Sequence, residues 1–276
     1  MSHIIVAVMI IIGEKLNGSI PSVAKAIAEK NEQFIRDLSR RQSEAGANFI
    51  DVCASVPEDR EIEVLKWMID IVQDACDTPI CVDSPSAKVC AQAIGLCEKP
   101  GLINSVSGEG DKINTIFPLI AGTGWECICL LSDDKGIPKT VERRIEIFHD
   151  IMKKAGEYKI AANRMYIDPL IEMLCASENG IATVTNTIIK VKELFPEIHV
   201  TGGASNISFN LPARKFINRA FIILAMNAGM DSAILDPLNK EMMGLLYATE
   251  ALLGKDDYCI EYINAFRKGL FEVKAG

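Results

Sequence analysis

Eight short apolar runs rich in Ile and Val recur along the chain, and longer segments with apolar residues at helical spacing lie between them. The runs predict β-strands at Ile10–Gly13, Asn48–Val52, Pro79–Asp83, Gly101–Ser105, Glu126–Leu131, Arg164–Asp168, His199–Gly203 and Ser232–Leu235. The periodic segments predict helices at Asn31–Glu44, Glu61–Cys76, Val141–Ala155, Ile181–Leu194, Pro212–Asn227 and Lys240–Leu253. Apolar strands that alternate with helices indicate parallel pairing, with helices covering the sheet.

Eight strand–helix units in a chain of 276 residues fit a closed (β/α)8 TIM barrel better than an open doubly wound sheet. No linker rich in Gly or Pro divides the sequence, so we expect a single domain over residues 1–276. The dinucleotide-binding fingerprint is missing, because Gly108-Glu109-Gly110 is followed by Asp111-Lys112-Ile113. These observations predict a fold of the α/β class, a single barrel without a Rossmann-type nucleotide-binding site.

One stretch, His199–Phe221, combines several unusual features. A short strand runs into Gly202-Gly203, the polar segment Ser205–Ser208 follows as an exposed turn, and a helix resumes after Pro212. Two glycines at the end of a strand let the backbone bend sharply or approach a ligand closely. An amide just beyond them, here Asn206, can donate and accept hydrogen bonds at once.

Polar side chains also follow the other predicted strands. They are Glu14 and Asn17, Asp51, Asp83, Asn104, Ser132 to Asp134, Asp168, Asn206 and Asp236. Taken singly each could cap the next helix, and Asp83 and Asp168, which precede Ser-Pro and Pro, look especially like caps or turns. In a barrel, however, the carboxyl ends of all strands meet at one mouth. The sequence therefore predicts a pocket lined by carboxylates and amides.

This set of side chains limits the ligand without identifying it. A carboxylate can accept two parallel N–H donors of a flat heterocycle such as a pterin, and an amide beside it can complete the pattern. The same acids could instead hold Mg²⁺, which prefers oxygen ligands. The three histidines are not spaced as zinc ligands, and no Lys, His or Cys stands out as a nucleophile. Composition alone leaves the heterocycle and the metal ion as alternatives.

The net charge, the first apolar run and the cysteine pattern limit the partners and the cellular location that we expect. A net charge of −8 argues against nucleic acid, because phosphate binding requires a basic face. The apolar run Ile4–Ile12 contains the start of the first predicted strand; it is too short to span a membrane and lacks the features of a signal peptide. Nine cysteines form no Cys-x-x-Cys pair, which favours reduced thiols. We expect a cytoplasmic protein with no membrane partner.

Several motifs stand together in a recognisable order. They are IIGEKLNG (Ile11–Gly18), Asp51, CVDSPS (Cys81–Ser86), INS (Ile103–Ser105), GIPK (Gly136–Lys139), YIDPL (Tyr166–Leu170), SNIS (Ser205–Ser208) and INRAF (Ile217–Phe221). From Ile10 to Phe266 the chain resembles the pterin-binding corrinoid methyltransferases. These include the methyltetrahydrofolate:corrinoid/iron–sulfur protein methyltransferases and their methylcorrinoid:tetrahydrofolate methyltransferase relatives.

The resemblance implies methyl transfer between N5 of tetrahydrofolate and the cobalt of a corrinoid (cobalamin) carried by a partner protein, in an enzyme that forms a homodimer. Carried over by position, the pterin-binding residues are Glu14, Asp83, Asn104, Asp168, Asn206 and Arg214. The same resemblance makes Asn206 the mobile amide that reaches N5 and places Asp51 at the border of the site. As a mechanistic hypothesis, we expect Asn206 to be the catalytic amide and Asp51 to be a second catalytic group that relays a proton. No metal ligand is implied.

Two positions depart from the family pattern. Cys53 stands where an amide is expected after the second strand, and Phe209 stands just beyond Asn206 where a Gln is expected. Two other functions stay open beside the leading one. The acids could serve a Mg²⁺-dependent barrel lyase or aldolase, or the chain could be a non-catalytic pterin-binding docking module.

Overall fold

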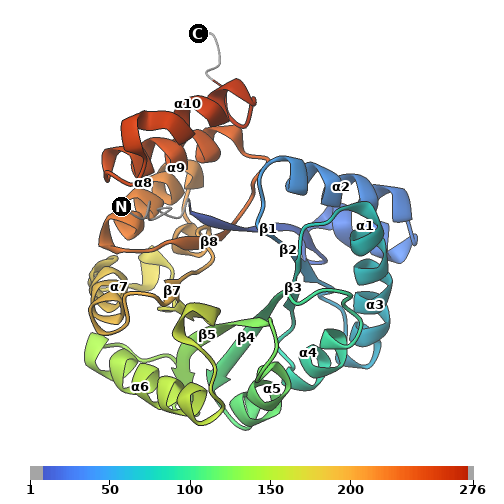
Figure 1. Cartoon of the computed structure of the whole chain (residues 1–276), viewed down its shortest axis with the longest axis horizontal. Coiled ribbons are helices and arrows are strands. Elements are labelled where there is room, and N and C mark those ends of the chain that lie inside the picture. Colours follow the sequence, from blue (N-terminus) through green and yellow to red (C-terminus); the bar gives the residue numbers. More distant parts are fainter. Residues whose placement is uncertain (1–8, 273–276) are drawn as a thin grey trace.

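The computed structural model describes residues 9–272, in which eight strands form a ring surrounded by helices (Figure 1). The strands are β1 Ile10–Asn17, β2 Phe49–Cys53, β3 Ile80–Asp83, β4 Leu102–Gly108, β5 Glu126–Asp133, β6 Met165–Asp168, β7 His199–Val200 and β8 Ser232–Leu235. All eight predicted strands are present. Residues 4–8 of the first apolar run lie outside the described residues.

The strands close into a barrel. Their order is β7-β6-β5-β4-β3-β2-β1-β8, and every neighbouring pair is parallel. A parallel bridge between Gly203 and Ile234 closes the ring, and the backbone N–H of Ile234 donates to the carbonyl of Gly202 at 3.0 Å. The predicted (β/α)8 TIM barrel is confirmed.

Helices cover the outside of the ring. They are α1 Pro21–Ala28, α2 Glu32–Glu44, α3 Glu58–Ala75, α4 Ala87–Ile94, α5 Lys112–Ile120, α6 Val141–Glu157, α7 Ala182–Leu194, α8 Arg214–Ala228, α9 Lys240–Leu252 and α10 Ile260–Arg267. The six predicted helices are all present. The pattern missed α1, α4, α5 and α10, because segments of eight or nine residues complete only about two turns and show little periodicity.

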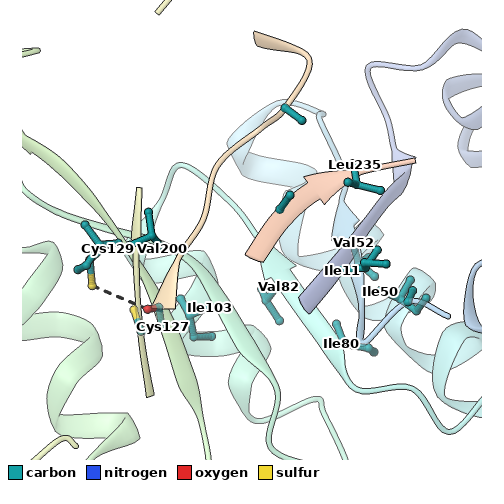
Figure 2. Close-up of a cluster of buried hydrophobic side chains, with 14 of the residues drawn as sticks. Ile11, Ile50, Val52, Ile80, Val82, Ile103, Cys127, Cys129, Val200 and Leu235 are labelled. Atoms are coloured by element: carbon teal, nitrogen blue, oxygen red, sulfur yellow. Dashed lines mark hydrogen bonds between the residues drawn. The ribbon is translucent and has the colours of Figure 1, made fainter. Parts of the chain in front are cut away.

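Side chains that point out of the barrel form the main core. Ile11, Ile50, Val82 and Ile103 are among the buried residues between the strands and the helices (Figure 2). Alternate residues of a strand face opposite sides of the sheet, so the residues between them point into the barrel. Those inward side chains form a separate apolar cluster: Ile12, Phe49, Cys81, Leu102, Ile128 and Tyr166.

This inward-pointing apolar cluster forms the floor of the barrel interior, just below the mouth at the carboxyl ends of the strands. Two residues further along the same strands, the next inward positions are Glu14, Asp51, Asp83, Asn104, Leu130 and Asp168. Because of the strand period of two, a buried apolar layer is followed directly by a layer that is polar at each of these positions except Leu130.

A β-bulge adjusts the first strand. Gly13 pairs with Ile50 and Leu16 pairs with Val52, so β1 contains one extra residue between these pairs. Because of this extra residue, Leu16 packs into the outer core while both Glu14 and Asn17 line the mouth. The predicted strand ended at Gly13, but the structure continues it through the bulge to Asn17.

Candidate functional site

A cavity of about 420 Å³ opens at the carboxyl ends of the strands. It is lined by Glu14, Asn17, Ser19, Ile20, Asp51, Asp83, Asn104, Asp168, Gly203, Ser205, Asn206, Phe209 and Ile234. Six of the seven residues proposed from the sequence are among these; the exception is Arg214. The structure thus brings together carboxylates and amides from β1, β2, β3, β4, β6 and the segment after β7.

Two of the predicted strand ends do not reach this cavity. After β5, Asp133 pairs with Arg143 and Asp134 accepts a hydrogen bond from the backbone of Gly110. After β8, Asp236 pairs with Lys15 at 3.1 Å and accepts a hydrogen bond from the backbone of Leu238. The expectation that all eight polar strand ends converge was wrong at these two, because each acid finds a local partner on the rim.

Asp51 and Asp83 form the acidic centre of the cavity. Burial raises the pKa of Asp51 well above its usual value, and the neighbouring charge of Asp83 raises that pKa further. Burial also raises the pKa of Asp83, while a hydrogen bond from the thiol of Cys53 opposes this shift. Asn104 donates from Nδ2 to Oδ1 of Asp51 at 3.4 Å. Burial and the charge of Asp83 therefore favour a state in which Asp51 holds a proton, while the hydrogen bond from Asn104 acts in the opposite direction.

Asn206 lies over the end of β7 because two glycines make room. A Cβ at Gly203 would stand 3.0 Å from Nδ2 of Asn206, and a Cβ at Gly202 would stand 2.6 Å from the side chain of Ile171. The close approach expected at this Gly-Gly pair is thus made by side chains of the protein itself. Asn206 begins a turn of 3-10 helix, Asn206–Ser208, which is less exposed than predicted because Ile207 and Ser208 are buried.

Asp168 uses one oxygen to shape its own loop. Its Oδ1 accepts a hydrogen bond from the backbone of Leu170 at 2.7 Å, in a turn where Leu170 has a φ of +64°. The expected turn role of Asp168 is therefore present, and the residue also lines the cavity. Burial raises the pKa of Asp168 to about 6, although the Leu170 hydrogen bond and the charge of Arg144 act in the opposite direction.

Arg144, which the sequence did not single out, fixes the loop that carries Asp168. Its side chain on α6 is fully buried, and its guanidinium donates to the carbonyls of Pro138, Pro169 and Leu170. It also reaches Glu172 at 3.4 Å. A buried guanidinium needs acceptors on all sides, so this contact set holds the β6–α7 loop in one position.

Arg214 has a similar bracing role on the next loop. Its Nε donates to Oγ of Ser208 and its Nη2 donates to the carbonyl of Ser205, each at 2.9 Å. Its guanidinium also lies 4.7 Å from the centre of the Phe209 ring. Arg214 therefore supports the segment that presents Asn206, and its charge lowers the pKa of Glu14.

Glu14 is the third acid with a perturbed pKa. Burial and the charge of Asp236 raise the pKa of Glu14 to about 7, while Lys15 and Arg214 oppose the shift. Among the described residues, neither the Glu14 carboxylate nor the Asn206 amide has a hydrogen-bond partner. Both groups line the cavity and are free to bind a ligand.

The departure at Cys53 has a local explanation. Its thiol lies 3.3 Å from the hydroxyl of Ser55, which donates to Oδ1 of Asn17 at 3.1 Å. Burial raises the pKa of Cys53, so the group stays a neutral thiol beside Asp83. Cys53 therefore contacts Asp83 directly and Asn17 through Ser55. It does not itself line the cavity.

The donor set suits a flat molecule rich in N–H groups. Carboxylates and amides with unused acceptor positions surround the cavity, and pairing with such donors would offset the cost of burying them. In the part of the chain from Met9 to Glu272, no three His, Cys, Asp or Glu side chains are placed so that they could hold a metal ion.

The raised pKa of Asp168 predicts a pH effect on stability. A carboxyl with a usual pKa of 3.8 that titrates near 6 when folded contributes stability below 3.8 and loses it as the pH rises to about 6. Asp168→Asn keeps the acceptor for Leu170 but cannot ionise. Between pH 4 and 6, the free energy of unfolding of the wild type should fall relative to Asp168→Asn by on the order of 1–3 kcal/mol.

Urea unfolding of both proteins at several pH values measures this difference. A constant difference across the range would contradict the raised pKa.

Sequence comparison assigns the chain to a family. Residues 14–236 match the family described as pterin binding enzymes. The chain is 49% identical over 263 residues to the methylcorrinoid:tetrahydrofolate methyltransferase of Eubacterium limosum, covering 95% of this chain and 97% of that protein. It is 26% identical over 242 residues to the methionine synthase of Mycobacterium tuberculosis, which covers 83% of this chain but only 20% of that much longer protein.

Known structures agree at the level of the fold. A dihydropteroate synthase from Xanthomonas albilineans superimposes with a TM-score of 0.67 at 17% identity, over 90% of this chain and 94% of that one. The Yersinia pestis enzyme gives 0.62 at 18% identity over the same shares of the two chains. At this identity the likeness establishes the barrel alone. From the match over residues 14–236 and the full-length relative, the chain belongs to the family of pterin binding enzymes.

Proposed function

We propose that the protein transfers a methyl group between N5 of tetrahydrofolate and the cobalt of a corrinoid. The observation that carries this proposal is the 49% identity over nearly the full length of both chains to a protein named for that reaction. The polar cavity supports it, because its carboxylates and amides suit a pterin. The direction of net transfer depends on the two methyl carriers and not on the catalyst.

Asp83, Asn104 and Asp168 would hold the pterin ring. They extend from the carboxyl ends of β3, β4 and β6, directly above the apolar floor. The free oxygen of Asp168 and the carboxylate of Asp83 can accept the ring N–H and amino donors, and Asn104 can pair with an adjacent acceptor. Glu14, on the opposite side in β1, would border the ring. Held in this way, the methyl group on N5 would point out of the barrel.

The corrinoid would arrive on another protein and supply the cobalt that carries the methyl group. The printed sequence contains no Asp-x-His-x-x-Gly cobalamin motif, and a corrin macrocycle is too large for a cavity of about 420 Å³. The partner protein would therefore dock over the loops that follow the strands.

Asn206 and Asp51 would handle the proton. When the pterin is methylated, the N5 lone pair forms the bond to carbon, the cobalt–carbon electron pair stays on cobalt, and N5 loses its proton. The Asn206 amide oxygen, which has no partner among the described residues, can accept from N5–H as charge builds there. Asp51, whose pKa is raised by burial, can relay the proton onwards. In the reverse direction the same groups would stabilise a protonated N5.

The surface of α8 supports the homodimer suggested by the family resemblance. Phe216, Ala220, Ile223 and Leu224 lie along one face of this helix and are all exposed. Their spacing of three to four residues makes a continuous apolar stripe, which is a feature of protein interfaces. We propose that two copies pair through this face. Sedimentation of the purified chain should show a dimer that Phe216→Glu converts to a monomer; a monomeric wild type would contradict the pairing.

We also propose a cytoplasmic location. All nine cysteines are free thiols, as expected in a reducing compartment. None of the helices in the described part of the chain is long and apolar enough to cross a membrane.

Two substitutions test the roles assigned to the cavity. Asn206→Ala should lower turnover by about 10²–10⁴-fold with little change in pterin affinity, because its contact matters only as charge develops on N5. Asp168→Ala should weaken pterin binding by about 10–100-fold, because it removes a charge-assisted hydrogen bond. Anaerobic assays with methylcob(III)alamin and tetrahydrofolate, together with pterin titrations, separate the two effects.

The control is Asn186→Ala, which removes an exposed amide from α7. It should match the wild type in both measurements. Equal losses of turnover and affinity in Asn206→Ala and Asp168→Ala would contradict the assigned roles. Tight pterin binding by a wild type without turnover would instead favour the non-catalytic docking module.

A further inference from the structure

A buried amide outside the cavity contacts the strand that carries Glu14. Gln42, on α2, is fully buried where this helix packs on β1, and it does not line the cavity. Its Oε1 accepts a hydrogen bond from the backbone N–H of Lys15 at 3.0 Å. Lys15 lies inside the β-bulge between Gly13 and Leu16. The amide therefore binds β1 at the point where the strand becomes irregular.

The bulge decides which side chains of β1 reach the mouth. In a strand without the extra residue, strict alternation would turn Leu16 toward the mouth and Asn17 toward the helices. The bulge reverses these two, so an amide replaces an apolar side chain at the cavity. A bulge leaves backbone groups without their regular partners on the neighbouring strand, and a buried N–H without an acceptor is destabilising. By accepting from Lys15, Gln42 stabilises the bulged form of β1.

Gly13 leaves the space that this contact needs. A Cβ at Gly13 would stand 2.7 Å from Oε1 and 3.3 Å from Cδ of Gln42. Among the described glycines, those with a positive φ do not include Gly13, so its backbone conformation suits other residues as well. The absence of a Cβ thus matters here for the close approach of the Gln42 amide.

The bulged segment presents three polar side chains in succession. The Glu14 carboxylate points into the cavity. Lys15 pairs with Asp236 at 3.1 Å, on the rim after β8. Oδ1 of Asn17 accepts from the hydroxyl of Ser55 at 3.1 Å, which connects the segment to the end of β2. A shift of the bulge would therefore move an acid and an amide of the cavity together.

Only the oxygen of the Gln42 amide is used. Its Nε2 is buried and has no hydrogen-bond partner in the part of the chain from Met9 to Glu272. A buried donor without an acceptor is unfavourable, and an apolar side chain of similar length would avoid that cost. Such a side chain would, however, lack a strong acceptor for Lys15. The contribution of the amide is therefore its acceptor at the bulge.

We propose that Gln42 is a positioning residue for the pterin: by holding Lys15 it fixes the bulge that turns Glu14 and Asn17 toward the ligand. This inference rests on the function proposed above. Gln42 does not reach the cavity, so it acts through those two side chains. A bulge that is fixed before binding spares the ligand the cost of ordering them.

Hydrogen exchange tests the contact without any ligand. In the wild type, the amide of Lys15 should exchange slowly, as NMR can follow residue by residue. Gln42→Met removes the amide oxygen at nearly constant length, and exchange should be about tenfold faster or more. Gln42→Glu should exchange like the wild type, because burial favours the protonated carboxyl, whose carbonyl oxygen still accepts. Gly13→Ala should match Gln42→Met, since its Cβ would displace Oε1.

Titration with tetrahydrofolate tests the effect on the site. Gln42→Met should bind about tenfold more weakly than the wild type, and Gln42→Glu should restore the affinity. Leu38→Ala is the matched control, because it removes a buried apolar side chain from the same helix. It should lower the midpoint of thermal unfolding and leave the affinity unchanged. This control separates the placement of the bulge from a general loosening of α2.

A double-mutant cycle shows whether Gln42 acts through Glu14. Glu14→Ala alone should also weaken binding, because it removes an acceptor from the cavity. In the protein that carries both Glu14→Ala and Gln42→Met, the loss should be smaller than the product of the two single losses. Losses that multiply in full would mean that the two residues act independently, and would overturn the proposal.

The other contrary results are distinct from one another. Unchanged exchange of Lys15 in Gln42→Met would show that the amide does not hold the bulge. Unchanged tetrahydrofolate affinity in Gln42→Met, or an equal loss in Leu38→Ala, would leave Gln42 with a structural role alone. A wild type that binds no tetrahydrofolate would overturn the function proposed above and any role of the bulge in binding, whereas the exchange of Lys15 would still decide whether Gln42 holds it.

Discussion

The whole site depends on the two-residue alternation of side chains inside a closed barrel. One inward layer, which includes Phe49, Leu102 and Tyr166, seals the interior with apolar groups. The next inward position on the same strands carries Asp51, Asn104 and Asp168. The strand register alone brings these polar groups together. A register that buries the first inward layer also places the second inward layer at the barrel mouth.

That arrangement places acids where burial is costly, and the surrounding loops limit the cost. Burial raises the pKa values of Asp51, Asp83 and Asp168. Arg144 and Arg214 engage backbone carbonyls of the loops after β6 and β7, so the groups that face the cavity stay in position without a ligand. Acceptors held in place and short of donors make a site that is organised before binding, which is what selective stabilisation of a developing charge requires.

Local sequence predicted the barrel and most of the polar layer, because apolar runs and the residues that follow them are visible in a single chain. It could not separate Asp168, which lines the cavity, from Asp236, which pairs with Lys15, since each follows a strand directly. The bulge that turns Asn17 inward could not be predicted either, because it is defined by the pairing of β1 with β2 and not by the sequence of β1 alone. Arg144 acts through carbonyls 25 and 26 residues away, a contact that no spacing along the chain reveals.

The central claim is that this cavity positions N5 of a pterin for exchange of a methyl group with cobalt. The most direct measurement follows a ¹³C-methyl label from methylcob(III)alamin by NMR, under anaerobic conditions with tetrahydrofolate and the purified protein. The account predicts that the label leaves cobalt and appears on N5, at a rate that depends on protein concentration. A label that stays on cobalt while tetrahydrofolate is bound, even with a corrinoid-carrying protein present, would contradict it.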